Sequence, residues 1–596
     1  MPLYARPFST AAHICPRLAT AVSTALIAGG IMTASAANQA PVPELRDYAK
    51  PGELAPLPDL AASLYKVPWR SNVRTVAAHD ALQGIGVYYK HIPNEWTESD
   101  DIAVMKQLAA AGVRRMRLAP HYAIYITKDW TAPKVQELLS LRNELRACHA
   151  AGIRPCVIFV HIPPIGKPGT RELQDWWKQG ELMPAGEVGS PEFKAYQDKT
   201  YAALLFLLKE ARDAGFRGKG SYDLELAQGI WWGAPACPRP LPSTTLADLK
   251  PGGRIYEFDR GLIQRLRKDG YAEPSVWWGM TYHHYEDCSD AEVPPEAVGR
   301  TTSYYSSWTG NTTNGWLGGN MYSGPQSPND VWPVRPELHF LEGAAPGIVL
   351  AKPEGWMADR SRRDNLIAFI QASKTPVAVS SLGTVPSDIP EATAGGLTGW
   401  QLKERGLTRS LAFWLNQGAP FVLLHSLFEP GAAQRGEMAH SLIPGPIDPA
   451  SFRWYQAPPL VTLRSFCAGL EDSKPLQAVT PLSFRYRLAP DPELIPATGA
   501  VGPLKASDAV ALLSFQLDEQ HFAVAAYVVT PNIAMPLTPV KLTLSVDRKL
   551  TAAGAATLRP YNGATGKAKI LARTDTATTL EAEIADDVTW LRFAVE

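Results

Sequence analysis

Between residues 83 and 430, the sequence alternates between amphipathic stretches of helical period and short runs that are apolar almost throughout. The stretch "DDIAVMKQLAAAG", for example, leads into "VRRMRLAPHY". Runs of this second kind are typical of parallel strands that are buried on both faces. Several helical stretches end in a glycine at the position of a left-handed helix cap, namely Gly112, Gly152, Gly215, Gly270 and Gly418. The pattern predicts an α/β fold in which helices connect parallel strands.

Eight apolar runs follow this pattern, at 83–89, 113–122, 153–162, 221–229, 275–287, 346–356, 375–383 and 419–430. Eight strand–helix units close into a (β/α)8 TIM barrel of about 250 residues or more. The alternative is an open, doubly wound sheet. The count of eight favours the barrel, and so does the lack of a glycine-rich phosphate loop after the first run.

The texture of the sequence changes after about residue 451. Short runs such as "HFAVAAYVV" and "VKLTLSV" follow one another, several with a period of two, and Asn562-Gly563 is a turn signal. This region predicts a C-terminal antiparallel β-sandwich. The expected organisation is therefore a signal peptide at 1–36, a linker or N-terminal extension at 37–78, the barrel at 79–450 and the β-sandwich at 451–596.

The first residues have the features of an export signal. Arg6 and Arg17 precede the apolar run "LATAVSTALIAGGIMTASA", which ends in the small residues Ala34, Ser35 and Ala36. The alternative is an uncleaved membrane anchor, but no stop-transfer flank follows and no later apolar run is long enough to span a bilayer. We expect a soluble, exported protein, periplasmic or extracellular, without an integral membrane span after cleavage.

Charge and cysteine content narrow the function classes. Lys and Arg together number 58, as do Asp and Glu, so the net charge gives no reason to expect a nucleic-acid partner. Of the six cysteines, five remain after signal cleavage, and no pair has zinc-site spacing. Cys237 and Cys288 are the best candidates for a disulfide in an exported protein. We expect no cofactor and no metal.

Polar and aromatic side chains gather at the predicted carboxyl ends of the strands, where barrel enzymes place their active sites. Polar groups in such a mouth bind hydroxyls and rings cover the apolar faces of sugars, although rings are also common in cores. The candidate substrate-binding residues are Arg117, His121, Tyr122, His161, Gln228, Trp231, Trp232, His283, His284, Glu286, Trp356 and His425. His283 and His284 are adjacent on a strand and point to opposite faces, which disfavours a shared metal ion.

The order of these features resembles the clan A glycoside hydrolases, most closely family 39, over residues 83 to 596. In that family, strand 4 carries a Glu-x-x-Asn-Glu pattern whose last Glu is the acid/base. The stretch "ELAQG" lies on it, so Glu225 matches the first Glu and Gly229 the acid/base. "PVAVSSLG" lies on the strand 7 pattern, and Ser381 matches the nucleophile. Arg117 matches the strand 2 arginine that holds this nucleophile. The resemblance therefore implies a sugar-cleaving barrel in which both catalytic carboxylates are substituted.

Two other carboxylates are candidates for the missing roles. Asp223, Glu225 and Ala227 share one side of a strand, so Glu225 is either a displaced acid or a hydrogen-bonded interior carboxylate. Glu354 is either a displaced nucleophile or a solvated loop residue paired with Lys352. We therefore expect a polysaccharide or oligosaccharide as partner. The protein is either a divergent glycoside hydrolase that uses Glu225 and Glu354, or a non-catalytic glycan-binding protein. Ester cleavage by Ser381 is a weak third option because a Gly-x-Ser-x-Gly elbow is lacking.

Overall fold

The computed structural model describes residues 44–48, 74–89, 95–118, 135–161, 187–228, 252, 254–279, 379–383, 398–416, 418–425, 427, 441–443, 447–495, 504–529 and 537–596. Its helices are α1 (Ala78–Gln83), α2 (Glu98–Ala110), α3 (Val135–Ala151), α5 (Pro191–Asp213), α7 (Arg254–Lys268), α11 (Gly399–Asn416) and α12 (Pro458–Ala468). Short 3-10 turns cover Trp454–Gln456 and Ala506–Ala509. Within this part of the chain, no helix is both long and apolar enough to cross a membrane.

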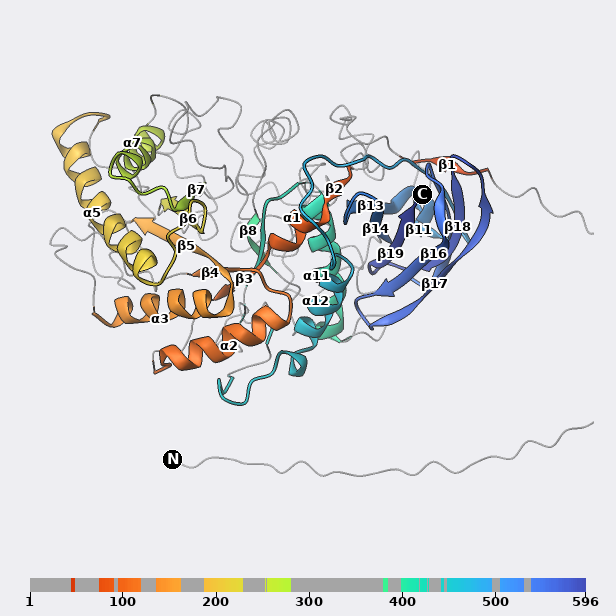
Figure 1. Ribbon diagram of the computed structural model, residues 1–596, viewed down its shortest axis with the longest axis horizontal. Coiled ribbons are helices and arrows are strands. Elements are labelled where there is room, and N and C mark those ends of the chain that lie inside the picture. Colours follow the sequence, from red (N-terminus) through yellow and green to blue (C-terminus); the bar gives the residue numbers. More distant parts are fainter. Residues whose placement is uncertain are drawn as a thin grey trace, which may run out of the picture. The chain divides into compact units, whose positions relative to one another are not determined.

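Seven strands form a parallel sheet, and along the chain these strands alternate with helices (Figure 1). The strands are β3 (Ile85–Tyr89), β4 (Arg115–Leu118), β5 (Arg154–His161), β6 (Tyr222–Gln228), β7 (Pro274–Gly279), β8 (Val379–Gly383) and β9 (Val422–His425). Their order is β7-β6-β5-β4-β3-β9-β8, and every neighbouring pair is parallel. The first strand thus lies beside the last, as closure of a barrel requires. The sixth predicted run, at 346–356, lies outside the described residues.

The two faces of this sheet differ in chemistry. One face carries apolar side chains such as Val87, Met116 and Leu224, which belong to the large hydrophobic core. The other face carries Tyr88, Arg117 and Glu225, and all three are buried as well. Because successive side chains of a strand point to opposite faces, the two sets alternate along each strand. The sheet is therefore covered on both faces, and only one of them is apolar.

Local signals explain where the helices begin and end. Thr97 caps α2 through a capping box with Asp100, and Ser190 caps α5 by accepting a hydrogen bond from the Phe193 amide at 3.1 Å. The predicted glycine caps are confirmed, because Gly112, Gly152, Gly215, Gly270 and Gly418 all have positive φ angles between 67° and 110°. Gly112 has a second constraint, since a Cβ there would lie 2.6 Å from the Cys467 sulfur.

The C-terminal strands form one continuous ten-stranded sheet, in the order β1-β10-β15-β18-β17-β16-β19-β14-β13-β2. The strands are β10 (Phe484–Ala489), β13 (Val510–Gln516), β14 (His521–Val528), β15 (Val540–Val546), β16 (Leu550–Arg559), β17 (Ala564–Arg573), β18 (Thr578–Ile584) and β19 (Thr589–Val595). A separate pair joins β11 (Glu493–Ile495) to β12 (Leu504–Lys505). The expected antiparallel pairing is present, and hydrogen bonds run through the whole sheet; its division into the two layers of a sandwich stays a prediction.

Both edges of this sheet come from the N-terminal extension. β1 (Arg46–Asp47) pairs with β10 in antiparallel fashion, and β2 (Val76–Ala77) pairs with β13 in parallel. Tyr48 then enters the core, where its hydroxyl accepts a hydrogen bond from the Leu512 amide at 2.9 Å. The 37–78 stretch, expected to be a linker, thus supplies two strands, and paired edges are protected from association with other chains.

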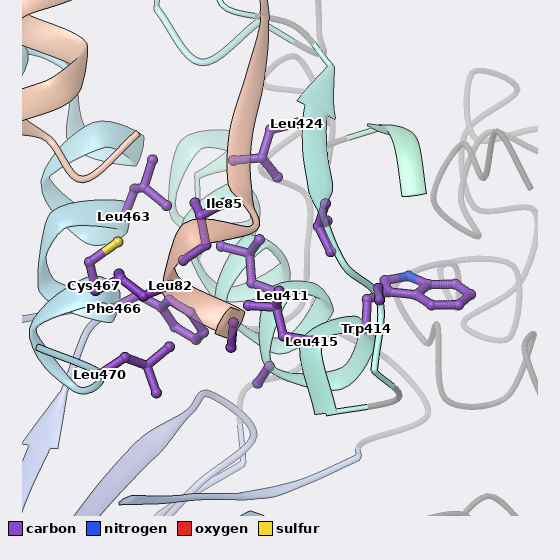
Figure 2. Close-up of a cluster of buried hydrophobic side chains, with 14 of the residues drawn as sticks. Leu82, Ile85, Leu411, Trp414, Leu415, Leu424, Leu463, Phe466, Cys467 and Leu470 are labelled. Carbon is purple, nitrogen blue, oxygen red and sulfur yellow. The ribbon is translucent and has the colours of Figure 1, made fainter. Parts of the chain in front are cut away.

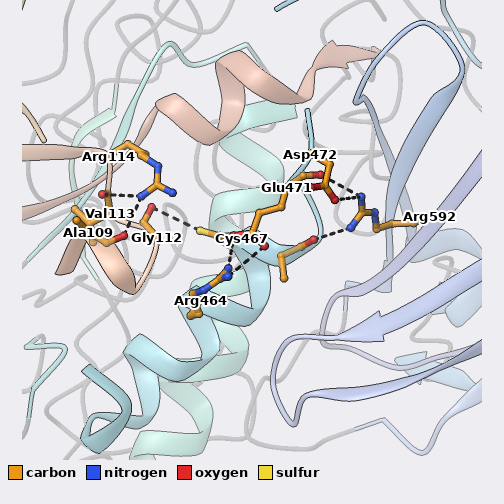
Figure 3. Close-up of polar contacts among 10 residues, drawn as sticks. Ala109, Gly112, Val113, Arg114, Arg464, Cys467, Glu471, Asp472 and Arg592 are labelled. Atoms are coloured by element: carbon orange, nitrogen blue, oxygen red, sulfur yellow. Dashed lines mark hydrogen bonds and ion pairs between the residues drawn. The ribbon is translucent and has the colours of Figure 1, made fainter. Parts of the chain in front are cut away.

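Helices α11 and α12 join the two sheets. Their apolar side chains, including Leu411, Leu463 and Phe466, pack with Ile85 and Leu424 of the parallel sheet (Figure 2). At the end of α12, the Cys467 sulfur lies 3.8 Å from the Gly112 carbonyl oxygen at the end of α2 (Figure 3). On the other side, Arg592 of β19 donates to the carbonyl oxygens of Ala468 and Glu471 at 3.0 and 3.1 Å. The end of α12 therefore contacts both the C-terminal sheet and the end of α2.

A buried charge network fastens α11 to the C-terminal sheet. Arg405 pairs with Asp586 and lies 3.8 Å from Asp587, and its guanidinium covers the Tyr561 ring at 5.1 Å. Asp587 also pairs with Arg559 at 2.6 Å. Both aspartates are fully buried, so removal of a partner leaves an uncompensated charge out of water.

We expect Asp586→Asn to lower the free energy of unfolding by about 3–5 kcal/mol, because Arg405 then loses its main buried counter-charge. Denaturant unfolding measures the change. Lys541→Ala is the control, since Lys541 forms a largely exposed ion pair with Glu581 at 3.9 Å and its loss costs less than about 1 kcal/mol. Equal effects of the two substitutions would contradict the assignment.

Candidate functional site

Two ion pairs lie one above the other on the polar face of the parallel sheet. Arg115 and Arg117 on β4 pair with Asp223 and Glu225 on β6, respectively. In each strand the two residues are two positions apart, which puts both on the same face. The strand between them, β5, pairs with both β4 and β6. Each arginine therefore reaches across β5 to the carboxylate, and the sequence prediction that Asp223 and Glu225 share a side is confirmed.

The upper pair is bidentate. Arg117 donates from Nε to Glu225 Oε2 at 3.0 Å and from Nη2 to Glu225 Oε1 at 2.9 Å. Its guanidinium also lies 4.7 Å from the centre of the Tyr88 ring, a cation–π distance. Burial alone would lower the pKa of Arg117, but the negative charge of Glu225 and the nearby Tyr88 raise the pKa above its usual value. The pair is thus ionised, fixed in orientation and fully buried.

The lower pair belongs to a wider cluster. Asp223 accepts hydrogen bonds from Arg115 and from Arg154 of β5, the latter at 2.6 Å. Arg154 also donates to the Ser275 hydroxyl of β7 at 3.1 Å, and Arg115 donates to the Gln83 carbonyl oxygen at 3.1 Å. These bonds tie four neighbouring strands and the end of α1 together beneath the Arg117–Glu225 pair.

The chemistry open to Glu225 follows from these contacts. Both of its oxygens accept hydrogen bonds from the guanidinium of Arg117. A general acid must hold a proton at the working pH and reach the leaving oxygen. Glu225 is 1% exposed and has the contacts of a structural or electrostatic group. The geometry agrees with the hydrogen-bonded interior carboxylate that was the simpler interpretation of this residue.

Arg117 has a different described partner from the one that the family resemblance implies. The resemblance assigns it to the residue at position 381, on β8. Its described bidentate hydrogen bonds go to Glu225, and the implied contact with position 381 stays a prediction. The backbone of Ser381 lies in β8, beside β9, and its side chain lies outside the described part of the structure.

Other predicted site residues are placed by their backbone alone. His161 and Gln228 are register partners at the carboxyl ends of β5 and β6, and His425 at the end of β9 pairs with Gly383 of β8. The structure thus brings His161 next to Gln228 at the strand edge where the site was predicted. The remaining predicted residues lie outside the described residues: His121, Tyr122, Gly229, Trp231, Trp232, His283, His284, Glu286, Glu354 and Trp356, as do Cys237 and Cys288.

Sequence reasoning missed part of this floor. Arg115, Arg154 and Tyr88 were not among the candidates, yet they surround the two carboxylates. The alternation of "RRMR" on β4 was the available signal, since it places Arg115 and Arg117 on one face. Three cysteines, Cys148, Cys156 and Cys467, are buried free thiols. Among the described side chains, no group of three or more His, Cys, Asp or Glu residues is arranged to hold a metal ion.

No protein-family model and no curated protein matches the sequence. Among solved structures, the chain is similar to AbfB, a family 51 α-L-arabinofuranosidase from Bifidobacterium longum. That match has 11% identity and a TM-score of 0.35, and it covers 93% of this chain and 100% of the other. A GH5_18 structure from Bifidobacterium longum subsp. infantis matches with 14% identity and a TM-score of 0.36, covering 68% and 81% of the two chains.

A further match is the exo-β-1,4-mannosidase Op5Man5 from Opitutaceae bacterium strain TAV5. Its identity is 14% and its TM-score 0.33, over 67% of this chain and 60% of that one. These neighbours are glycoside hydrolases of families 51 and 5. The closer likeness to family 39 stays a prediction.

We expect Arg117→Met to destabilise the protein by about 3–5 kcal/mol, because Glu225 is then buried without its counter-charge. The double variant Arg117→Met, Glu225→Leu removes both charges and should recover most of this loss. Denaturant unfolding of the single and double variants measures the coupling between the two residues. Strictly additive effects of the two substitutions would show that the pair is not coupled.

Proposed function

We propose that this chain is an exported, carbohydrate-active protein built as a (β/α)8 barrel with a C-terminal β module. The cyclic strand order supports the barrel, because the first strand pairs with the last and residues 346–356 would close the sheet between β7 and β8. Burial of both sheet faces agrees with a filled barrel interior. The apolar stretch before Ala36 supports export.

The observation that carries the proposal is the ionised Arg117–Glu225 pair beneath the carboxyl ends of β4 and β6. It gives the strand edge a rigid polar floor, and His161 and Gln228 stand side by side at that edge. Polar residue types at this strand edge, with the Trp-rich segments that follow β6 and β7 in sequence, suit a ligand rich in hydroxyl groups. A polysaccharide or oligosaccharide is the ligand that this chemistry favours.

Two activities are compatible with such a ligand. The first is hydrolysis of a glycosidic bond, which needs two carboxyl groups and for which Glu225 and Glu354 are the candidates. The second is binding without hydrolysis. The guanidinium of Arg117 favours the second, because it occupies both oxygens of a buried Glu225 that would otherwise have to reach the ligand. The sequence resemblance places Gly229 and Ser381 at the positions of the catalytic carboxylates in family 39, which supports the same choice.

We expect the purified protein to retain oligosaccharides in a glycan-array or calorimetric assay. If it also hydrolyses them, Glu354→Gln should lower the rate of reducing-sugar release by about 10²–10⁴-fold, the usual contribution of a catalytic carboxyl. Glu225→Gln should lower it too, together with the stability. Glu192→Gln is the control, because Glu192 is an exposed carboxylate in the first turn of α5.

The outcomes separate the two activities. Binding with no sugar release assigns the chain as a glycan-binding protein. Sugar release that survives both Glu225→Gln and Glu354→Gln removes these two residues from catalysis. A wild-type protein that neither binds nor cleaves any glycan of a broad polysaccharide panel would overturn the proposed function.

A further inference from the structure

Two carboxyl groups outside the candidate site are buried where α2 packs against α3. Asp101 belongs to the beginning of α2 and Glu144 to the middle of α3, and each is 3% exposed. The two helices lie side by side (Figure 1). Both carboxyls also lie near Tyr89, the last residue of β3, whose pKa their charges raise. Charged groups this deep in a protein need a counter-charge or a proton.

The described partners of these carboxyls are neutral hydroxyl groups. Tyr89 donates to Asp101 Oδ1 at 2.7 Å, and Ser140 donates to Glu144 Oε1 at 3.0 Å. The second oxygen of Glu144 is buried and has no hydrogen-bond partner among the described residues. No described Lys or Arg forms an ion pair with Asp101 or Glu144. A hydroxyl partner does not compensate a full negative charge, so the protonated form of each acid suits its surroundings better.

The neighbouring titratable groups increase this preference. On α2, Glu98 and Asp100 carry charges of the same sign as Asp101 and raise its pKa. On α3, Cys148 is a buried thiol whose sulfur lies 3.4 Å from that of Met105. On α3, Arg146 pairs with Glu98 at the surface at 3.0 Å, and Arg142 pairs with Glu210. Tyr89 of β3 completes the set of titratable groups that face the two acids.

The pKa values follow this geometry. Burial raises the pKa of Asp101 to about 7, although the hydrogen bond from Tyr89 opposes the change. Burial also raises the pKa of Glu144 well above its ordinary range, and the charge of Asp101 adds to the effect. Asp100, one residue away but exposed, has a lowered pKa because Thr97 donates to it from its backbone and side chain.

We propose that Asp101 and Glu144 form an acid-stabilised lock, which holds α2, α3 and the end of β3 together while the two carboxyls are protonated and loosens as they ionise. The lock includes the Tyr89–Asp101 hydrogen bond, which joins the end of β3 to the start of α2 across residues 90–100. It therefore controls how firmly the first strand–helix connection is held at the carboxyl edge of the sheet. This property is independent of any carbohydrate activity.

The direction of the pH effect follows from linkage. A carboxyl with a raised pKa in the folded state binds a proton that the unfolded chain has already released. Its stabilising contribution is complete below the unfolded pKa, near 4, and is lost as the pH rises through the folded pKa. For Asp101 this window extends to about pH 7. Within it, one such group increases the unfolding equilibrium constant by up to about tenfold per pH unit.

The test measures denaturant unfolding of the full chain, and hydrogen exchange of peptides from 98–110 and 135–151, between pH 5 and 8. Asp101→Asn and Glu144→Gln mimic the protonated acids, so each should reduce the pH dependence by about one proton. In wild type, exchange of both helices, corrected for intrinsic rates, should speed up as the pH rises. Glu404 of α11, whose pKa burial raises to about 7, adds to the wild-type profile, but it is unchanged in every variant.

Asp100→Asn is the matched control. It removes an adjacent acid whose own pKa is lowered, so it should keep the wild-type number of protons in the pH dependence. Because the Asp100 charge also raises the pKa of Asp101, the transition should move slightly to lower pH. Tyr89→Phe provides a second variant in case Asp101→Asn fails to fold. It deletes a bond that favours ionised Asp101, so it should move the loosening of the two helices to higher pH.

The proposal is overturned if Asp101→Asn and Glu144→Gln keep the wild-type pH dependence, or if exchange of the two helices does not change with pH. It is also overturned if Tyr89→Phe moves the transition to lower pH. These measurements involve no sugar, so a negative result would not affect the carbohydrate proposal. Equally, a protein that binds no glycan would not contradict the lock.

Discussion

The buried pairing of β4 arginines with β6 carboxylates is the constraint on which the arrangement of the parallel sheet depends. Arg115 and Arg117 reach across β5, so they meet Asp223 and Glu225 only when three strands are in the observed register. A slip of one residue would turn a strand's charged side chains toward the apolar core. Charges buried without partners are costly, whereas a buried pair adds little net stability. We infer that these pairs contribute mainly to the choice of register.

The sequence predicted the elements of the fold well where its pattern was strong. Seven of the eight apolar runs contain described parallel strands, and the five glycine caps have the expected left-handed backbone. The edge strands β1 and β2 could not be predicted from the sequence, since each is two residues long within a Pro- and Ala-rich segment. Continuity of the C-terminal sheet was equally hidden, because strand pairing depends on distant partners and strand pattern is a local property.

The candidate site was predictable only in part, for a similar reason. Alternation along β6 identified the side shared by Asp223 and Glu225, but it did not reveal which cations face them. The partners lie on a strand that is not adjacent to β6, at a sequence separation of 108 residues. The contact between Arg117 and Glu225 depends on the tilt and stagger of three strands, which no local pattern encodes.

The floor of the sheet also limits what the carboxyl edge is able to do. Arg117 holds both oxygens of the buried Glu225, so under the proposed function a proton donor for glycosidic cleavage would come from another residue at the edge. The same pair would also support a site that binds a ligand without cleaving it. It holds β4 and β6 together and uses no side chain at the carboxyl edge itself. Under the proposed function, the same floor supports the strand edge even where Gly229 and Ser381 replace the catalytic carboxylates of the family that the sequence resembles. The scaffold can therefore be kept in a protein that has no catalytic activity. Under the proposed function, the groups that project from the edge decide whether the ligand is cleaved or only bound.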